Sequence, residues 1–288
     1  MSEEKCDGKC EGCAECNSCE DSTQKASPKI PKLKTAEGVE IKHIIGVLSG
    51  KGGVGKSFVA SYLAVLLAKR GYRVGVLDAD ITGPSIPFAF GVNAKALGDE
   101  NGLIYPALTS DLHIQIMSSN MLLDNATDPI LWRGPMVGQM VGQFYTQVKW
   151  EYVDYLVVDM PPGTGDAALT IFQQLPVDGI VIATTPQSLV SMIVEKGCKM
   201  AGMMNIPVLG LVSNMSYVKC PKCGEKIMIY GNDHVEELSQ RYGIPVTASV
   251  PLDANISSTM DAGAVEKLDI PYLDKLVDSI AEMEPKAE

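Results

Sequence analysis

The first chemical signal in the chain is a glycine-rich run, Gly50-Lys51-Gly52-Gly53-Val54-Gly55-Lys56-Ser57, with the spacing G-x-x-x-x-G-K-S. Glycines let the backbone bend around an anion and point its N–H groups inward. Lys56 would then reach the β and γ phosphates of a nucleotide, and the Ser57 hydroxyl would bind Mg²⁺. An apolar run precedes the segment and a helical pattern follows it. The sequence therefore predicts a P-loop that binds a nucleoside triphosphate.

The same glycines leave a second interpretation open. Gly50, Gly52 and Gly55 also satisfy the dinucleotide-binding pattern G-x-G-x-x-G, and Asp78 follows at the end of the next predicted strand. A triphosphate needs a cation and a Mg²⁺ ligand directly after the last glycine, whereas a nicotinamide cofactor needs neither. The Lys-Ser pair therefore favours the triphosphate.

Acidic residues that close predicted strands are expected near this loop. Asp159 ends an apolar strand, where a carboxylate can hold Mg²⁺ through water. The Gly- and Pro-rich segment Pro161–Asp166 follows and is suited to change conformation on hydrolysis. Asp78 and Asp80 close the second strand, so one of these two carboxylates can orient the attacking water.

Thiolate chemistry is indicated by Cys220-Pro221-Lys222-Cys223-Gly224, a tight turn whose two sulfurs can face one metal. Nothing nearby in the sequence completes a four-ligand site, and a two-fold dimer would bring a second pair. Zinc and an iron-sulfur cluster both fit this spacing. A thioredoxin-like redox pair would need a helix after the first cysteine, but residues 224–230 look extended.

Five more cysteines lie near the beginning of the chain: Cys6, Cys10, Cys13, Cys16 and Cys19. Their spacing is close enough for several of them to bind a second cluster. A metal-buffering tail without a defined cluster is the alternative.

The elements that must position these residues follow an α/β pattern. Strands are predicted at residues 44–49, 73–77, 114–117, 155–158, 180–183, 208–212 and 246–250, with an amphipathic helix over Ser57–Arg70 that Gly71 ends. Helices are also expected over 135–149, 189–203 and 272–283, and a loop over 83–107. Short apolar strands between helices are typical of a buried parallel sheet. We expect a Cys-rich tail and linker over residues 1–40 and one domain over residues 41–288.

Composition excludes other classes of protein. Twenty-four Lys and Arg against 35 Asp and Glu give a net charge of -11, which disfavours nucleic acid and anionic membranes as partners. The first residues lack an apolar leader, and no stretch has the 18 or more apolar residues that cross a bilayer. A cytoplasmic protein is expected.

The lysine at position 51, directly after the first glycine, resembles the deviant Walker A motif of the MinD/ParA class, which includes the nitrogenase iron protein. Within that class the chain is similar to the Mrp/ApbC family of iron-sulfur cluster carrier ATPases. Four blocks carry the similarity: LDADITGPSIP from Leu77, WRGPM from Trp132, VVDMPPGTGD from Val157 and NMSYVKCPKCGE from Asn214.

This resemblance implies a three-layer α/β P-loop NTPase with a mostly parallel sheet and helices on both faces. It implies that ATP is bound and hydrolysed by a homodimer, which passes a 4Fe-4S cluster to apoproteins. It also implies roles for single residues: Lys51 acts on the partner's phosphates, Asp80 positions water, Asp159 assists Mg²⁺, Asn214 recognises adenine, Asp166 belongs to a second switch, and Cys220 and Cys223 hold the bridging cluster.

Three other functions remain open. A positioning ATPase of the MinD or ParA kind would need a basic amphipathic helix or a basic DNA-binding face, whereas residues 272–283 are acidic. An electron donor similar to the nitrogenase iron protein would take its ligands from two separated cysteines. A regulatory ATPase with a zinc-clamped dimer would share every motif.

Overall fold

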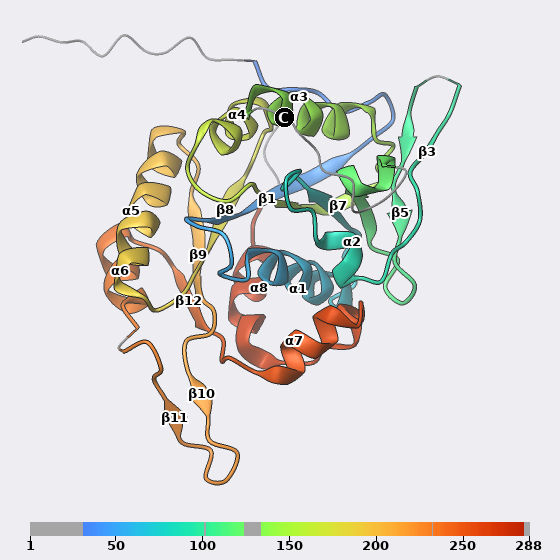
Figure 1. Ribbon diagram of the computed structural model, residues 1–288. Coiled ribbons are helices and arrows are strands. Elements are labelled where there is room, and N and C mark those ends of the chain that lie inside the picture. Colours follow the sequence, from blue (N-terminus) through green and yellow to red (C-terminus); the bar gives the residue numbers. More distant parts are fainter. Residues whose placement is uncertain (1–30, 101, 124–133, 232, 285–288) are drawn as a thin grey trace, which may run out of the picture. The chain divides into compact units, whose positions relative to one another are not determined.

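The centre of the fold is a β-sheet, seen in a computed structural model that describes residues 31–100, 102–123, 134–231 and 233–284 (Figure 1). Its strands are β1 (Ile41–Ser49), β2 (Val74–Asp78), β5 (Ala107–Leu108), β6 (Gln115–Ser118), β7 (Val153–Asp159), β8 (Gly179–Thr184), β9 (Val208–Ser213) and β12 (Val246–Ser249). They run in the order β12-β9-β8-β1-β7-β2-β6-β5, and all neighbours are parallel except β5 with β6. All seven predicted strands are present.

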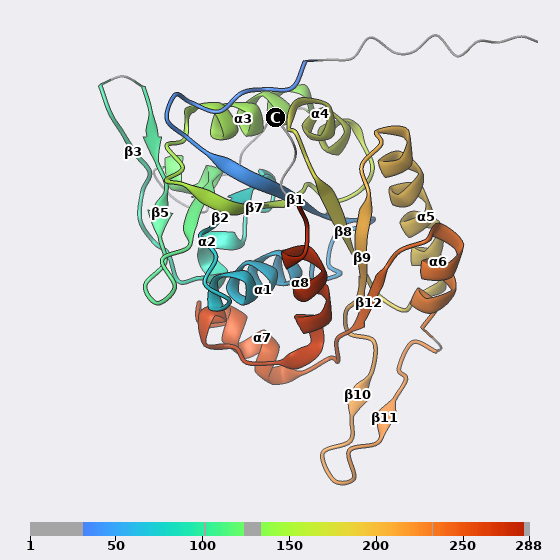
Figure 2. The same cartoon turned by 180° about the vertical axis from the view of Figure 1, so that it is seen from behind.

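Helices cover both faces of this sheet (Figures 1 and 2). On one face lie α1 (Lys56–Lys69), α2 (Ile86–Ala89), α7 (Ala254–Asp261) and α8 (Asp274–Ala281), and on the other α3 (Gly134–Gln147), α4 (Asp166–Gln174), α5 (Ser188–Met203) and α6 (Val235–Tyr242). The sheet therefore has a hydrophobic core on each face, and successive residues of a strand point into opposite cores. In β1, Ile45 and Val47 pack on the α1 side, and Ile44 and Leu48 pack on the α3 side. Because the strands are buried on both faces, they read as continuous apolar runs. The predicted α/β class is confirmed.

The helix after the glycine-rich run departs from the prediction. It is present as α1, and Gly71 follows its end with φ 90° as expected, but it is not amphipathic. Every residue from Phe58 to Leu67 is buried, because α1 lies between the sheet and helices α2 and α8. A helix that is enclosed on all sides is apolar all round.

Close packing joins α3 to α4 and to the segment before β1. A Cβ atom on Gly138 would lie 2.3 Å from Cγ2 of Thr170 in α4, so only glycine fits there. Ahead of β1, the N–H of Leu33 donates to the carbonyl of Gln174 at 2.8 Å, and Lys32 Nζ donates to the carbonyl of Leu175 at 3.0 Å. Part of the predicted linker therefore lies on α4. The boundary at residue 40 stays a prediction, because residues 1–30 lie outside the described part.

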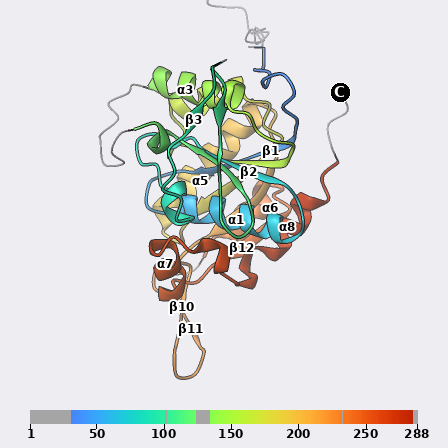
Figure 3. The ribbon, with the colours of Figure 1, turned by 90° about the vertical axis from the view of Figure 1, so that its right-hand side faces the viewer.

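Two short hairpins lie outside the central sheet. The expected loop over 83–107 contains α2 and a hairpin of β3 (Leu97–Gly98) and β4 (Ile104–Tyr105), which are too short to produce a periodic pattern. The second hairpin, β10 (Val218–Lys219) and β11 (Lys226–Ile227), extends away from the body of the domain (Figures 1 and 3).

The last predicted helix is shorter than expected, because a 3-10 turn, Pro271–Leu273, precedes α8. Its apolar residues Leu276, Val277 and Ile280 are buried in the core, and Asp278 pairs with Arg70 at 2.7 Å. The apolar face of α8 therefore packs inside the domain. Across the described residues, no helix combines the length and apolarity needed to cross a bilayer.

We predict that Gly138→Ala lowers the free energy of unfolding by about 1–3 kcal/mol, because the added methyl group forces α3 and α4 apart. Gly202→Ala is the matched control, since Gly202 is also helical but has no atom within 4 Å of the added position. It should be neutral or stabilising by up to about 1 kcal/mol. Urea unfolding midpoints measure both, and equal midpoints would contradict the packing argument.

Candidate functional site

The chemistry-bearing residues gather where parallel strands end. Asp159 lies beside Asp78 in the pairing of β7 with β2, and Asp78 lies beside Ser118 in the pairing of β2 with β6. On the other side, Val47 of β1 pairs with Asp159, and the chain leaves β1 two residues later at Ser49. Ligands of open α/β sheets bind outside the carboxyl ends of the strands, so this edge is the candidate site.

The glycine-rich run joins β1 directly to α1, as predicted. Gly53 and Gly55 have φ 78° and 84°, in the left-handed region that favours glycine. A Cβ atom on Gly50 would lie 1.7 Å from Cγ2 of Ile193, and one on Gly55 would lie 2.1 Å from Nδ2 of Asn214. The loop therefore needs these glycines both for its backbone angles and for its close approach to α5 and to the end of β9.

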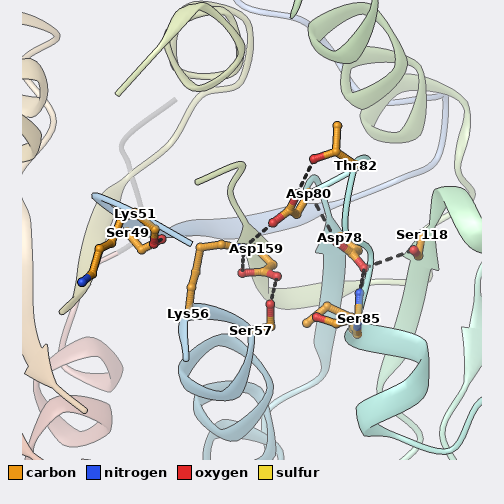
Figure 4. A network of polar contacts seen from close by, with 11 residues as sticks. Ser49, Lys51, Lys56, Ser57, Asp78, Asp80, Thr82, Ser85, Ser118 and Asp159 are labelled. Atoms are coloured by element: carbon orange, nitrogen blue, oxygen red, sulfur yellow. Dashed lines mark hydrogen bonds and ion pairs between the residues drawn. The ribbon is translucent and has the colours of Figure 1, made fainter. Parts of the chain in front are cut away.

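Asp159 holds the lysine and the serine that end this loop (Figure 4). Lys56 Nζ donates to Asp159 Oδ1 at 2.6 Å, and Ser57 Oγ donates to Asp159 Oδ2 at 2.7 Å. Lys56 is only 6% exposed and Asp159 is fully buried. The three residues predicted to contact phosphate and Mg²⁺ thus lie together, although they come from positions about a hundred residues apart.

Carboxyl groups outnumber the ammonium group of Lys56 at this edge. Burial raises the pKa of Asp159, and Lys56 opposes that shift. Burial and the charge of Asp159 raise the pKa of Asp78 to about 8. Asp80 adds a third carboxylate, with Oδ2 3.4 Å from Lys56 Nζ. Carboxylate and hydroxyl oxygens are ligands that Mg²⁺ prefers, so Ser57 and Asp159 are a suitable donor set for it.

The two acidic residues after β2 differ in position. Asp80 lines the cleft above the loop, whereas Asp78 is fully buried. Asp166 begins α4 and is exposed, and it is not among the residues that line the cleft. Pro162, in the preceding loop, does line it.

A cleft of about 430 Å³ opens over the P-loop. Asn214 lies at one side, with Nδ2 donating to the carbonyl of Val54 at 3.0 Å, so half of this amide supports the loop. The rest of that side was missed from the sequence: it consists of Met215, Pro251, Leu252, Asp253, Ile256, Ser257, Met260 and Asp261. The available signal was that Pro251–Asp253 come just after β12, which ends at Ser249, because the carboxyl ends of parallel strands share one edge.

Lys51 points away from Lys56 and Asp159 (Figure 4). Its Nζ donates to Oε1 of Gln187, just before α5, at 2.6 Å. The two lysines of the loop are therefore oriented in different directions.

The second set of predicted ligands lies at the tip of the β10–β11 hairpin. The N–H of Gly224 donates to the carbonyl of Cys220 at 2.9 Å and closes the turn, in which Gly224 has φ 74°. N–H groups of Cys223 and Lys222, and the Cys223 thiol, lower the pKa of Cys220. Cys223 is exposed, and β11 after the pair is extended rather than helical, which disfavours a thioredoxin-like pair.

Within residues 31–100, 102–123, 134–231 and 233–284, no three His, Cys, Asp or Glu side chains come together as a metal site. The hairpin thus offers two ligands of its own. Cys6, Cys10, Cys13, Cys16 and Cys19 lie outside the described residues. Cys198, in α5, is buried in the core, as a small apolar residue would be, and burial raises its pKa to about 11.

Comparison with known proteins decides the family. A ParA model described as "NUBPL iron-transfer P-loop NTPase" matches residues 40–283. This chain belongs to that family. The nucleotide-binding P-loop NTPase fold follows from the membership, and the resemblance seen in the sequence is confirmed.

Similar proteins carry consistent descriptions. An "Iron-sulfur cluster carrier protein" of Clostridium perfringens is 42% identical over 269 residues, which cover 90% of this chain and 94% of that protein. The "Iron-sulfur cluster transfer protein NUBPL" of Mus musculus is 44% identical over 243 residues, covering 84% and 75%.

A solved structure from Archaeoglobus fulgidus, a nucleotide-binding protein in complex with ADP, is 42% identical with a TM-score of 0.71 and covers 79% of this chain and 88% of that one. The cell division ATPase MinD of Pyrococcus furiosus has a TM-score of 0.53 at 19% identity, covering 84% and 99%, and shares the fold alone. The roles of single residues in this chain stay predictions.

We predict that iodoacetamide alkylates Cys220 at a pH at which an ordinary thiol is still mostly protonated. The lowered pKa increases the thiolate fraction at any pH below it, and the thiolate is the reacting form. Cys198 is the internal control, because its raised pKa and burial should keep it unmodified up to at least pH 9. Peptide mass spectrometry across a pH series measures both. A midpoint for Cys220 at or above the ordinary thiol value of about 8.5 would contradict the hairpin geometry.

Proposed function

We propose that this chain is an ATP-dependent carrier that assembles a 4Fe-4S cluster between two copies of itself and passes it to apoproteins. The observation that carries the proposal is a pair of accessible thiols on a projecting hairpin of a P-loop domain. The iron-sulfur carriers from other organisms, similar along most of their length, support the same cargo.

ATP hydrolysis is the first half of the proposal. The triphosphate lies in the loop Gly50–Ser57, where N–H groups and Lys56 face its charge. Mg²⁺ supplies neutralisation of the phosphates when bound, with Ser57 as a hydroxyl ligand and Asp159 acting through water. Asp80 orients the attacking water. The distance of 3.4 Å between Asp80 Oδ2 and Lys56 Nζ supports that role, because it places the carboxylate beside the phosphate-binding lysine.

Lys51 acts on the nucleotide of a partner subunit. The direction of its side chain, toward Gln187 and away from Lys56, supports this role. A cation supplied by the partner offsets transition-state charge only when the dimer is closed, as an arginine finger does. Asn214, at the far side of the cleft, recognises adenine with the half of its amide that does not hold Val54.

The cluster site is the second half. Cys220 and Cys223 supply two thiolates, and the two-fold partner supplies two more at the symmetry axis. ATP acts as a switch: the affinity for the cluster can change only by the difference in free energy between dimer arrangements. The tail cysteines hold a second cluster or buffer metal, and the cytoplasmic location expected from the sequence is part of the same proposal.

Two alternatives use the same motifs. A zinc-clamped regulatory ATPase would also bring four thiolates together, and metal analysis distinguishes it. A MinD- or ParA-like positioning role is disfavoured by α8, whose apolar residues Leu276, Val277 and Ile280 are buried in the core and so are not displayed to a membrane.

The decisive experiment is anaerobic purification with iron, sulfide and zinc analysis, visible absorption and light scattering. Iron and sulfide in equal amounts, at least four of each per dimer, support the carrier. Stoichiometric zinc without iron supports the clamp. Material that stays colourless and monomeric after iron, sulfide and ATP are added overturns both.

For the nucleotide half, Lys56→Ala should abolish ATP turnover, because it removes the cation that faces the β and γ phosphates. Lys51→Ala should retain nucleotide binding by one subunit but lower kcat by about 10³-fold, the smaller effect of losing an arginine-finger-like group. Lys275→Ala, exposed on α8, is the control and should match wild type. Phosphate release and ADP titration measure these quantities, and unchanged hydrolysis by Lys56→Ala removes the P-loop assignment.

For the cluster half, Cys220→Ser combined with Cys223→Ser should abolish the bridging cluster while the fold survives, since the tip of the hairpin lies outside the core. A variant with all five tail cysteines changed to serine is the matched control and should keep that cluster. Iron and sulfide content and thermal unfolding measure the outcome. Full iron and sulfide in the hairpin variant would count against the site.

A further inference from the structure

Asp78 is a fully buried carboxylate at the end of β2 for which the proposed reaction gives no direct task. Its side chain accepts four hydrogen bonds (Figure 4). Oδ2 accepts from the N–H of Ser85 at 3.1 Å, the N–H of Ile86 at 3.2 Å and the hydroxyl of Ser118 at 3.1 Å. Oδ1 accepts from the N–H of Asp80 at 3.2 Å.

Three of these four donors lie at the ends of one loop, residues 79–85, or directly after it, and the fourth, Ser118, lies on β6. Asp80 stands at its beginning and Ser85 at its end, so the carboxylate of Asp78 holds the two ends together from inside. Within the loop, the N–H of Gly83 donates to the carbonyl of Asp80 at 3.1 Å, and the hydroxyl of Thr82 donates to Asp80 Oδ1 at 3.1 Å. Among the described residues, Asp78 is the only side chain that accepts hydrogen bonds from both ends of this loop.

The stability of the sheet does not require a carboxylate at this position. The rest of β2 is Val74, Gly75, Val76 and Leu77, and an apolar residue at position 78 would avoid burying a polar carboxyl group beside Asp159. What an apolar residue could not do is accept hydrogen bonds from the backbone of the Asp80 loop. Apart from Ser118, the donors it satisfies are Asp80 and Ser85 of that loop and Ile86, the first residue of α2 directly after it.

We infer that Asp78 is a positioning residue for ATP hydrolysis, which holds the 79–85 loop so that Asp80 faces Lys56, and that Ser118 of β6 orients Asp78. The inference rests on the proposed function, because it needs Asp80 to act in hydrolysis. Asp78 acts through the backbone, so its loss should affect the chemical step rather than the binding of nucleotide to the P-loop.

Two variants and a matched control test this role. Ser118→Ala removes one donor to Asp78 and leaves the carboxylate in place. Asp78→Asn keeps an oxygen for Ser85, Ile86 and Ser118 but turns an NH₂ group toward the N–H of Asp80. Ser119→Ala is the control: Ser119 is adjacent and equally buried, yet within the described residues its hydroxyl has no hydrogen-bond partner.

We expect kcat for ATP hydrolysis to fall about tenfold or more in Asp78→Asn and about threefold to tenfold in Ser118→Ala, since small misplacements of a reacting group are costly. The dissociation constant for ADP should stay within about twofold in both, and Ser119→Ala should match wild type in both quantities. Amide hydrogen exchange of a peptide covering residues 79–86 should accelerate in Asp78→Asn. If Asp78→Asn does not fold, Ser118→Ala decides.

The variants distinguish a failure of the positioning role of Asp78 from a failure of the proposed function. If Asp80→Asn is inactive while Asp78→Asn and Ser118→Ala keep full turnover, the inference is overturned and the proposed function stands. A loss of ADP binding in parallel with kcat would indicate a merely structural role and would also overturn it. Full turnover by Asp80→Asn would overturn the proposed role of Asp80, and the positioning role with it.

Discussion

A buried ion pair organises the site: Lys56 Nζ lies 2.6 Å from Asp159 Oδ1, at the end of β1 and β7. Taking both charges out of water costs more than an apolar pair in the same place would, so the pair does not serve stability alone. The two side chains meet because β1 and β7 are neighbours in the sheet. The P-loop begins directly after β1, so Lys56 at its end lies beside Asp159 at the end of β7. The enclosure of α1 between the sheet and α8 then keeps Lys56 in place.

A short segment, residues 214–217, connects the P-loop region to the β10–β11 hairpin, and hydrogen bonds fix its backbone. Asn214 donates to the carbonyl of Val54 in the P-loop, and four residues later the chain enters β10. Between them, the N–H of Ser216 donates to the carbonyl of Val250, and the N–H of Leu252 donates to the carbonyl of Tyr217. Leu252 also lines the cleft. Hydrogen bonds along this segment thus connect residues that line the cleft to the base of the hairpin.

Most of the fold could be predicted from local patterns. Apolar runs such as Tyr155–Val158 are strands because they are buried on both faces, and the spacing of Gly50, Gly55 and Lys56 can satisfy few other geometries. The error on α1 has a clear cause: apolar residues at positions 59, 60, 63, 64, 66 and 67 predict one apolar face, but Phe58, Tyr62 and Val65 make the opposite side apolar as well, and all of them are buried. The α2 turn and the β3–β4 hairpin were missed because elements of two to four residues have no period.

By itself, the sequence determined which chemistry is present: glycines, a lysine and a serine at the spacing of a phosphate loop, and two cysteines in one tight turn. These signals are local, because each depends on backbone conformation over fewer than ten residues. Only the tertiary structure separated Asp78 from Asp80, placed Met215 and Pro251–Asp253 along the cleft, and oriented Lys51 away from Lys56. Those facts depend on strand order and on contacts between distant segments, and a linear spacing carries no information about either.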